Sequence, residues 1–238
     1  MVNLERLDLT DCKMVSDLAF LGAMVNLQDL SMDGCICVSN VAPLSAMVQL
    51  QRLNLRICYG VSDLAPHAAL VNLQSLDVSY CSVSDLAPLA AIVDLKSLDM
   101  RYCKLVSNLA PLTDMLNLKS LNMDVCHRVS DLTPLSTMVN LQSLDMSFCS
   151  AFNLNPLSAM ENLQHLNISH CSSVSDLAPL AIMVSLESLD MSRCMKVSDL
   201  APLTALAKLH TLDVRDCSCV SNLAPLEGMV NLKKILIK

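Results

Sequence analysis

One unit of 22 or 23 residues recurs along the whole chain, and this repetition constrains the fold more than any other feature. The unit reads Leu-x-x-Leu-x-Leu-x-x-Cys-x-x-Val-Ser-Asp-Leu-Ala-Pro-Leu-x-x-Met-Val-Asn, and its positions are numbered from the first Leu. A tandem array of this period predicts a solenoid, because one unit alone cannot bury its apolar side chains. Residues 1–238 therefore form a single domain of ten units and a closing strand, beginning at Leu4, Leu27, Leu50, Leu73, Leu95, Leu118, Leu141, Leu163, Leu186, Leu209 and Leu232.

Each unit contains a short segment in which apolar and polar residues alternate, as in Leu98-Asp99-Met100. Such alternation is typical of a β-strand. Strands at the same place in successive units must run parallel, and the repeated Leu, Val and Met side chains then point into a shared interior. The chain has no Trp and only 3% aromatic residues, so this interior is predicted to be aliphatic.

All nine prolines occupy position seventeen of the unit, where the first unit has Phe20. Proline cannot donate a hydrogen bond to a sheet, so this part of the unit is predicted to be a turn or short helical segment on the outer side. The Asp or Asn three residues earlier, as in Asp63, Asp85 and Asn108, is well placed to cap that segment.

Cysteine occupies position nine of every unit, which accounts for ten of the twelve cysteines. Side chains stacked in this way point in parallel rather than toward one another, which argues against disulfides between neighbouring units. We expect a ladder of buried free thiols that fill small inward sites and donate weakly to loop carbonyls. Reduced thiols indicate a reducing compartment. The ladder comprises Cys12, Cys35, Cys58, Cys81, Cys103, Cys126, Cys149, Cys171, Cys194 and Cys217.

The remaining two cysteines, Cys37 and Cys219, are predicted to face solvent on a turn. His165, His170 and Cys171 fall within one unit, but they form only a weak metal-binding pattern. No second cysteine pair stands near either extra thiol in the sequence. We therefore expect no metal site and no cofactor.

Charge and hydropathy exclude several classes of partner. The net charge is -7 with a pI near 5.1, whereas binding to nucleic-acid phosphates needs clustered Lys and Arg. The longest apolar runs are about eight residues, and a membrane-spanning helix needs roughly twenty. The N-terminus lacks the basic flank and apolar stretch of a signal peptide. Together with the reduced thiols, this predicts a cytoplasmic protein. No Gly-rich phosphate loop and no Gly-x-Ser-x-Gly motif occurs, so we expect that it is not an enzyme.

The Leu-x-x-Leu-x-Leu-x-x-Cys block resembles the leucine-rich repeat, and the resemblance covers the whole chain. The Asp-Leu-Ala-Pro-Leu half is similar to the short repeats of bacterial internalins, which normally carry Asn in place of this Cys and are usually 22 residues long. The 23-residue Cys version also resembles repeat proteins of trypanosomatid parasites. The resemblance implies an α/β-type solenoid, a horseshoe with a concave parallel sheet and short helical or 3-10 turns on the convex side. It also implies binding of a macromolecule on the concave sheet.

Positions three, five and seven of the unit should face outward from the sheet, because side chains alternate along a strand. Position five is mostly Asp or Asn and includes Asp145, while position three is mostly Ser. This face is either a solvated surface, with Asp charges partly offset by Arg56, Arg101 and Arg215, or a docking strip for a basic or hydrogen-bond-donating partner. Neighbouring carboxylates, such as Asp77 beside Asp99 or Asp190 beside Asp213, are unfavourable without a partner or counterion.

Position eight carries larger side chains through the third to ninth units, with three of the chain's six Phe and Tyr residues. They either cover the bend after the strand or form part of a binding surface, since aromatic residues and Arg are enriched at binding hot spots. These seven residues are Ile57, Tyr80, Tyr102, Val125, Phe148, His170 and Arg193. The predicted partner-binding set combines both rows and comprises Arg56, Asp77, Tyr80, Asp99, Arg101, Tyr102, Asp145, Phe148, His170 and Arg193.

Three functional hypotheses remain open. The first is a non-enzymatic protein-interaction scaffold that uses its concave face, and the second is a structural or engineered repeat array without a native ligand. The third is the sensor or targeting domain of a larger enzyme. The chain begins in register with internal Met-Val-Asn-Leu segments and stops directly after a strand, with neither end carrying a polar cap. These features predict either a fragment or an end-to-end homodimer.

Overall fold

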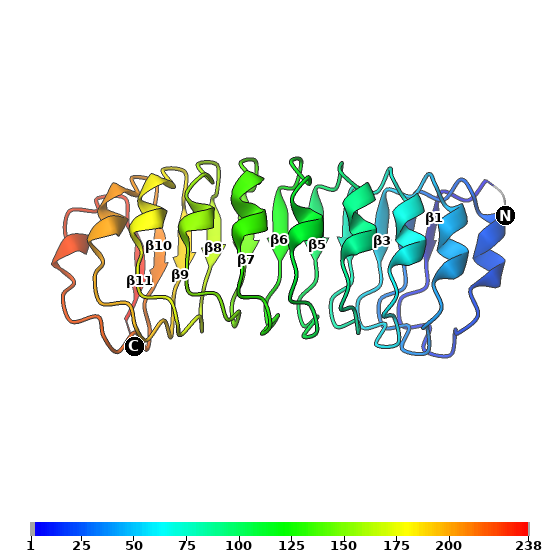
Figure 1. Ribbon diagram of the computed structural model, residues 1–238, viewed down its shortest axis with the longest axis horizontal. Coiled ribbons are helices and arrows are strands. Elements are labelled where there is room, and N and C mark those ends of the chain that lie inside the picture. Colours follow the sequence, from blue (N-terminus) through cyan, green and yellow to red (C-terminus); the bar gives the residue numbers. More distant parts are fainter. Residues whose placement is uncertain (1–2, 238) are drawn as a thin grey trace.

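The computed structural model describes residues 3–237 and forms one elongated solenoid (Figure 1). Eleven short strands join in chain order into a single parallel sheet, which confirms the predicted repeat fold. The strands are β1 (Arg6–Asp8), β2 (Asp29–Ser31), β3 (Arg52–Asn54), β4 (Ser75–Asp77), β5 (Ser97–Asp99), β6 (Ser120–Asn122), β7 (Ser143–Asp145), β8 (His165–Asn167), β9 (Ser188–Asp190), β10 (Thr211–Asp213) and β11 (Lys234–Leu236).

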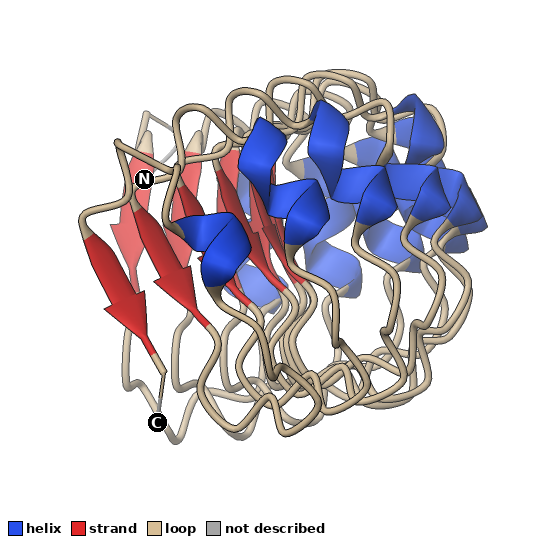
Figure 2. Cartoon of the chain, turned by 90° about the vertical axis from the view of Figure 1, so that its left-hand side faces the viewer, coloured by secondary structure: helices blue, strands red, loops and turns tan. Residues whose placement is uncertain are grey.

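A 3-10 helix lies in each unit on the side opposite the sheet, where a turn or short helical segment was predicted (Figure 2). Proline stands at the start of nine of the ten helices, where its missing N–H removes no hydrogen bond. The helices are η1 (Ala19–Ala23), η2 (Ala42–Ala46), η3 (Ala65–Ala69), η4 (Ala87–Ala91), η5 (Ala110–Leu112), η6 (Thr133–Thr137), η7 (Asn155–Leu157), η8 (Ala178–Ile182), η9 (Ala201–Ala205) and η10 (Ala224–Leu226).

The Asp and Asn side chains predicted to cap these helices do bind the first helical N–H, but they stand one residue before the N-cap, which is itself a Leu or Val without a side-chain bond. Asp63 accepts a hydrogen bond from the N–H of Ala65 at 2.8 Å, and Asn108 accepts one from Ala110 at 2.9 Å. The same bond occurs in all ten units. The acceptor precedes the helix start by two residues, so the bond closes a side-chain turn that aims the chain into the helix.

Every strand pairs with its neighbour at equivalent unit positions, as Leu98 does with Leu121. The two 22-residue units keep this register, since Ser75 pairs with Ser97 and Ser143 with His165. The missing residue is removed from the loop after the ladder cysteine. Each repeat position therefore forms a straight row across the sheet, and row composition decides what each surface presents.

The interior is filled by aliphatic side chains, as predicted. Rows of Leu, Met, Val and Cys are buried from Leu18 to Leu226, and partly buried residues extend the core at both ends. The exception is His67, which replaces the Leu of the Ala-Pro-Leu segment and is fully buried. Its Nδ1 lies 3.2 Å from the carbonyl of Leu64, while its Nε2 has no hydrogen-bond partner among the described residues. Burial lowers the pKa of His67 to about 4.

All twelve cysteines are free, and the buried ladder is confirmed for nine of its ten members, whereas Cys12 in the first unit is only half-buried. Each thiol from Cys35 onward donates to the carbonyl of position six in the preceding unit, as Cys58 does to Met32 at 3.2 Å. Burial raises the pKa of Cys58 to about 12, so this thiol stays protonated. Cys37 and Cys219 are exposed, as predicted.

Candidate partner-binding surface

The Asp and Asn side chains of position five build the turn that follows each strand. In nine of the ten units the side-chain Oδ1 accepts a hydrogen bond from the N–H of position seven. Asp77 accepts this bond from Ser79 at 2.8 Å, and Asn122 accepts it from Asp124 at 3.1 Å. Asp and Asn serve equally because both offer the same acceptor oxygen. This structural role was not predicted from the sequence, although the occurrence of either Asp or Asn at position five is a signal for it.

The turn places position eight in the left-handed backbone region in all ten units. The nine residues other than Gly34 have φ values between 57° and 63°. This conformation suits Gly, Asn and Asp, and costs other residues roughly 1–2 kcal/mol each. It was also missed, because position eight varies from Asp11 to Tyr80 and Arg193. The presence of Gly34, Asp11 and Asp216 in the same row was the available signal.

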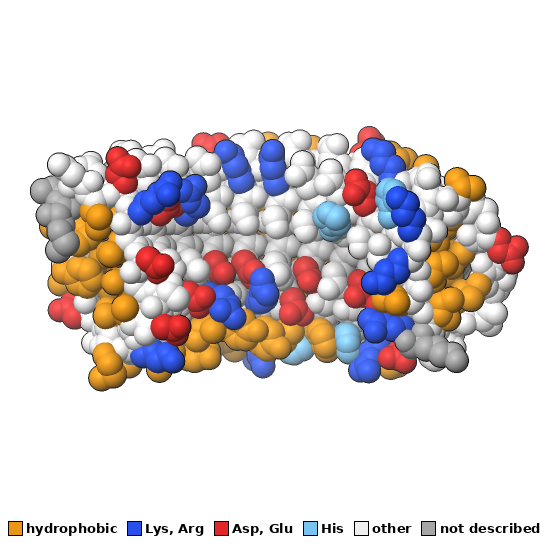
Figure 3. Space-filling view, turned by 180° about the vertical axis from the view of Figure 1, so that it is seen from behind, with side chains coloured by type: hydrophobic (Ala, Val, Ile, Leu, Met, Phe, Trp, Pro, Cys, Tyr) orange, Lys and Arg blue, Asp and Glu red, His pale blue; other side chains and the backbone are white. Residues whose placement is uncertain are grey.

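The side chains of position eight form a row of ring contacts at the carboxyl ends of the strands. We call Ile57, Tyr80, Tyr102, Val125, Phe148, His170 and Arg193 the position-eight row. Tyr80 and Tyr102 stack with ring centroids 4.4 Å apart, and Phe148 and His170 stack at 3.8 Å. Figure 3 shows hydrophobic and histidine atoms gathered along this lower edge, in the middle of the molecule.

Cations and a third ring extend these stacks. The Arg56 guanidinium lies 5.7 Å from the ring centroid of Tyr80, and Lys104 Nζ lies 5.3 Å from that of Tyr102. His127 meets Phe148 edge-on at 6.2 Å. Burial, with Arg193 as a second cause, lowers the pKa of His170, which favours the neutral ring for stacking. Phe148 is 38% exposed, Tyr80, Tyr102 and His170 are half-buried, and Val125 is buried.

The predicted arginine compensation of the sheet face is confirmed in specific pairs. Arg101 forms a two-pronged ion pair with Asp99, and Arg215 pairs with Asp213 at 2.6 Å. Arg56 pairs with Asp33 of the preceding unit at 3.1 Å. These pairs neutralise individual carboxylates rather than the face as a whole.

Asp77 is left less well compensated. It lies opposite Asp99 on the neighbouring strand, and its hydrogen bonds come from Ser79 rather than from a cation. Burial raises the pKa of Asp77; Asp99 adds to the rise, while the bonds from Ser79 oppose it. The neighbouring pair Asp190 and Asp213 differs, because Arg215 accompanies Asp213.

The structure brings the predicted residues into one continuous strip, with Arg193 at its far end, 3.1 Å from Asp216. Asp77, Asp99 and Asp145 lie in the position-five row, and the position-seven row, with Ser79, Arg101 and Ser147, lies between it and the position-eight row. Figure 3 shows carboxylate atoms above the hydrophobic edge. Contact of any of these residues with a partner stays a prediction.

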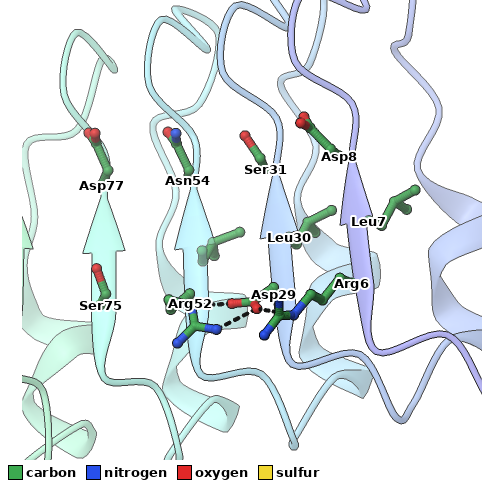
Figure 4. A pocket seen from close by; sticks show the side chains of 11 residues that line it. Arg6, Leu7, Asp8, Asp29, Leu30, Ser31, Arg52, Asn54, Ser75 and Asp77 are labelled. Atoms are coloured by element: carbon green, nitrogen blue, oxygen red, sulfur yellow. Dashed lines mark hydrogen bonds and ion pairs between the residues drawn. The ribbon is translucent and has the colours of Figure 1, made fainter.

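A second feature lies on the sheet face of the first four units and was missed in the sequence. Position three, described as mostly Ser, carries Arg6, Asp29 and Arg52 there. Arg6 Nε lies 3.1 Å from Asp29 Oδ2, and Arg52 Nη2 lies 2.5 Å from the same oxygen (Figure 4). These residues border a shallow hollow of about 560 Å³ that reaches Asp77. Both arginines pair with the single carboxylate of Asp29.

Within residues 3–237, no three His, Cys, Asp or Glu side chains converge on a possible metal position. No helix in the same range is both long and apolar enough to cross a membrane.

Comparisons with known proteins support the fold. No protein-family model matches the sequence, and no curated protein does either. Among solved structures, the internalin inlF of Listeria monocytogenes aligns with a TM-score of 0.91 at 24% identity, covering 99% of this chain and 67% of its own. Internalin C2 (inlC2) of the same species aligns at 0.74 and 27% identity, covering 96% and 97%. The leucine-rich repeat domain of the type III effector XopL aligns at 0.63 and 18%, covering 98% and 75%.

Proposed function

Since the chain is a leucine-rich repeat solenoid, we propose that it is a non-enzymatic scaffold that binds a protein partner. The binding surface combines the position-eight row with the adjoining sheet face of the third to ninth units. Rows of equivalent residues on one face of the solenoid suit this role, because a partner lying across the strands can contact many units at once.

The observation that carries the proposal is the conflict between side chain and backbone at position eight. Ile57, Tyr80, Val125 and Phe148 stand where the backbone favours Gly or Asn. Strained positions that persist in a fold are concentrated at functional sites. Rings and Arg at these positions are also the residue types that dominate binding energy at interfaces. A repeat array without a ligand would gain stability from Asn in this row.

A cytoplasmic or otherwise reducing location is part of the proposal. The ladder thiols are separate and donate to carbonyls, as in Cys103 to Val78 at 3.2 Å. Cys37 and Cys219 are exposed and unpaired, so an oxidising compartment would promote cross-linking between molecules through them.

The test compares partner capture by matched variants. Tyr80→Asn, Tyr102→Asn and Phe148→Asn together remove the rings while keeping side chains that tolerate the left-handed backbone. The control replaces Val25, Val71 and Val139 with Thr, since these residues are 42%, 50% and 44% exposed outside the strip. Tagged proteins are incubated with lysate of the source cells, and bound proteins are identified by mass spectrometry.

A protein retained by the wild type and the Val variant but lost by the ring variant supports the proposal. Equal retention by all three proteins would show that the position-eight row binds nothing. Circular dichroism of each variant establishes that it is folded.

A further inference from the structure

Acidic residues outnumber basic ones in one part of the sheet face only. Positions three, five and seven of the first three units carry three acids and three arginines. The same positions in the fourth to ninth units carry five acids and the single cation Arg101. We call this second region the middle sheet face, and its acids are Asp77, Asp99, Asp124, Asp145 and Asp190.

The two regions also differ in how their carboxylates are satisfied. In the first units, Arg6 and Arg52 share Asp29, and Arg56 takes Asp33. In the middle sheet face, Asp99 is the one carboxylate with an ion pair to any of residues 3–237. Charge on the chain itself therefore balances the first region and leaves the second region negative.

Three carboxylates of the middle sheet face each present one oxygen without a partner. Asp77 and Asp190 use Oδ1 for the turn, and Asp124 uses Oδ1 to accept from the Ser147 hydroxyl. No hydrogen bond from any residue between 3 and 237 reaches Oδ2 of these three residues. Asp145 differs, since its Oδ2 accepts from Asn167 at 3.0 Å.

Asp124 at position seven directly precedes the position-eight row in sequence, and Asp77 and Asp190 at position five stand three residues before it. A partner segment that lies on the rings of Tyr80, Tyr102 and Phe148 and extends over the adjoining sheet meets these carboxylates. An acidic segment would meet uncompensated like charges, whereas a basic segment would supply the missing cations. Arg side chains suit both rows, because a guanidinium pairs with carboxylates and stacks on aromatic rings.

We propose that the partner contributes an extended basic segment that lies across the strands, with its cations on Asp77, Asp124 and Asp190 and its apolar side chains on the position-eight row. This inference rests on the proposed function and specifies the partner's chemistry. Strands of a sheet are about 4.8 Å apart, so Asp77 and Asp124 are two strands, or roughly 10 Å, apart across the sheet, with Asp124 two residues further along the unit. In a polyproline II segment, which rises about 3.1 Å per residue, the separation across the strands alone corresponds to basic residues about three positions apart.

The probe is a fluorescein-labelled peptide with the repeated sequence Arg-Pro-Tyr, compared with a Glu-Pro-Tyr peptide by fluorescence anisotropy. The test variant combines Asp77→Asn, Asp124→Asn and Asp190→Asn. Asn preserves the turn bond at position five, as Asn54 and Asn122 do in this chain. The matched control combines Asp63→Asn, Asp85→Asn and Asp176→Asn, which makes the same charge change before the helices.

We expect the Arg peptide to bind the wild type at low salt and the Glu peptide not to bind. The sheet-face variant should weaken the Arg peptide about tenfold, since exposed ion pairs contribute modestly, while the control variant changes affinity less than twofold. Added salt should weaken binding to the wild type more than to the sheet-face variant.

Three outcomes would overturn the inference. The first is that the Arg peptide fails to bind, and the second is that the Arg and Glu peptides bind equally. The third outcome is that the sheet-face and control variants weaken Arg-peptide binding equally. The ring variant with Asn at positions 80, 102 and 148 separates this inference from the proposed function. If the ring variant loses Arg-peptide binding and the sheet-face variant does not, the position-eight row remains a binding surface. The inference that the partner's cations pair with the sheet-face carboxylates is then wrong.

Discussion

Tyr80 and Tyr102 stack face to face at 4.4 Å, although both residues have a left-handed backbone with φ values of 63° and 60°. The stack follows from register, because parallel pairing of β4 and β5 places equivalent residues side by side. The turn bonds that Asp77 and Asp99 accept from the N–H groups of Ser79 and Arg101 then orient both rings along the same edge. A local turn device, repeated in register, thus produces an extended surface of rings.

Relief of the strained backbone should stabilise the protein. Ile57 is β-branched and has a φ of 61°, so Ile57→Asn is expected to raise the free energy of unfolding by roughly 1 kcal/mol. Urea denaturation followed by circular dichroism measures the change. Ile182→Asn is the control, because Ile182 is 43% exposed and lies in η8. A loss of stability in Ile57→Asn as large as that in Ile182→Asn would contradict a backbone cost at position eight.

The thiols should divide sharply by reactivity. Only thiolates react rapidly with an aromatic disulfide reagent, and burial raises the pKa of Cys58 and of the other buried ladder thiols. We expect the native protein to react rapidly at Cys37 and Cys219, more slowly at the half-buried Cys12, and at all twelve thiols after denaturation. Cys37→Ser with Cys219→Ser should abolish the rapid phase. Rapid reaction of more than three native thiols would mean that the ladder is open to solvent.

End-to-end pairing of two molecules stays a prediction. β1 pairs with β2 alone and β11 with β10 alone among the described strands, and Ile235 is 38% exposed on β11. Outer edges of this kind can accept another strand. Sedimentation velocity over a range of concentrations should show a dimer that Ile235→Lys disrupts. A strict monomer at high concentration would contradict pairing.

Features that depend on a single unit, and on which all units agree, could be predicted from the sequence. Alternating Leu-x-Leu gave the parallel strands, the proline row gave the outer helices, and the cysteine row gave the buried thiols. Each of these choices is the same in nearly every unit, so its physical cause is visible in the residue pattern.

Features that depend on geometry between residues could not be predicted in the same way. The left-handed backbone at position eight was hidden because Tyr102, Val125 and Arg193 do not favour it. Arg56 and Asp33 both occupy position seven, in neighbouring units, so their ion pair depends on how adjacent units stack. The position-five carboxylates were seen only as a face, because their turn bonds depend on which oxygen meets the backbone N–H.

Replacing the poorly compensated carboxylate of Asp77 should raise the free energy of unfolding at neutral pH. Its folded-state pKa is raised by burial first and then by Asp99, so the ionised form destabilises the folded protein above that pKa. Asp77→Asn keeps the turn acceptor, and its gain in unfolding free energy should vanish as pH falls through the raised pKa. Denaturant titrations over acid to neutral pH measure this. Asp145→Asn is the comparison. Asp145 Oδ2 already accepts a hydrogen bond from Asn167, so this substitution should give a smaller gain in unfolding free energy.

The buried imidazole of His67 should make the solenoid sensitive to mild acid. The folded-state pKa is about 4, below the unfolded value of 6.5, so the unfolded chain binds the additional proton first. Stability is therefore retained above the unfolded pKa and lost as pH falls toward the folded pKa. The loss should be about 2 kcal/mol between about pH 7 and pH 5. His67→Leu restores the Leu of the other units, and should be more stable and should lose less stability over this range. Equal pH dependence of the two proteins in urea denaturation would show that His67 is not the acid-sensitive group.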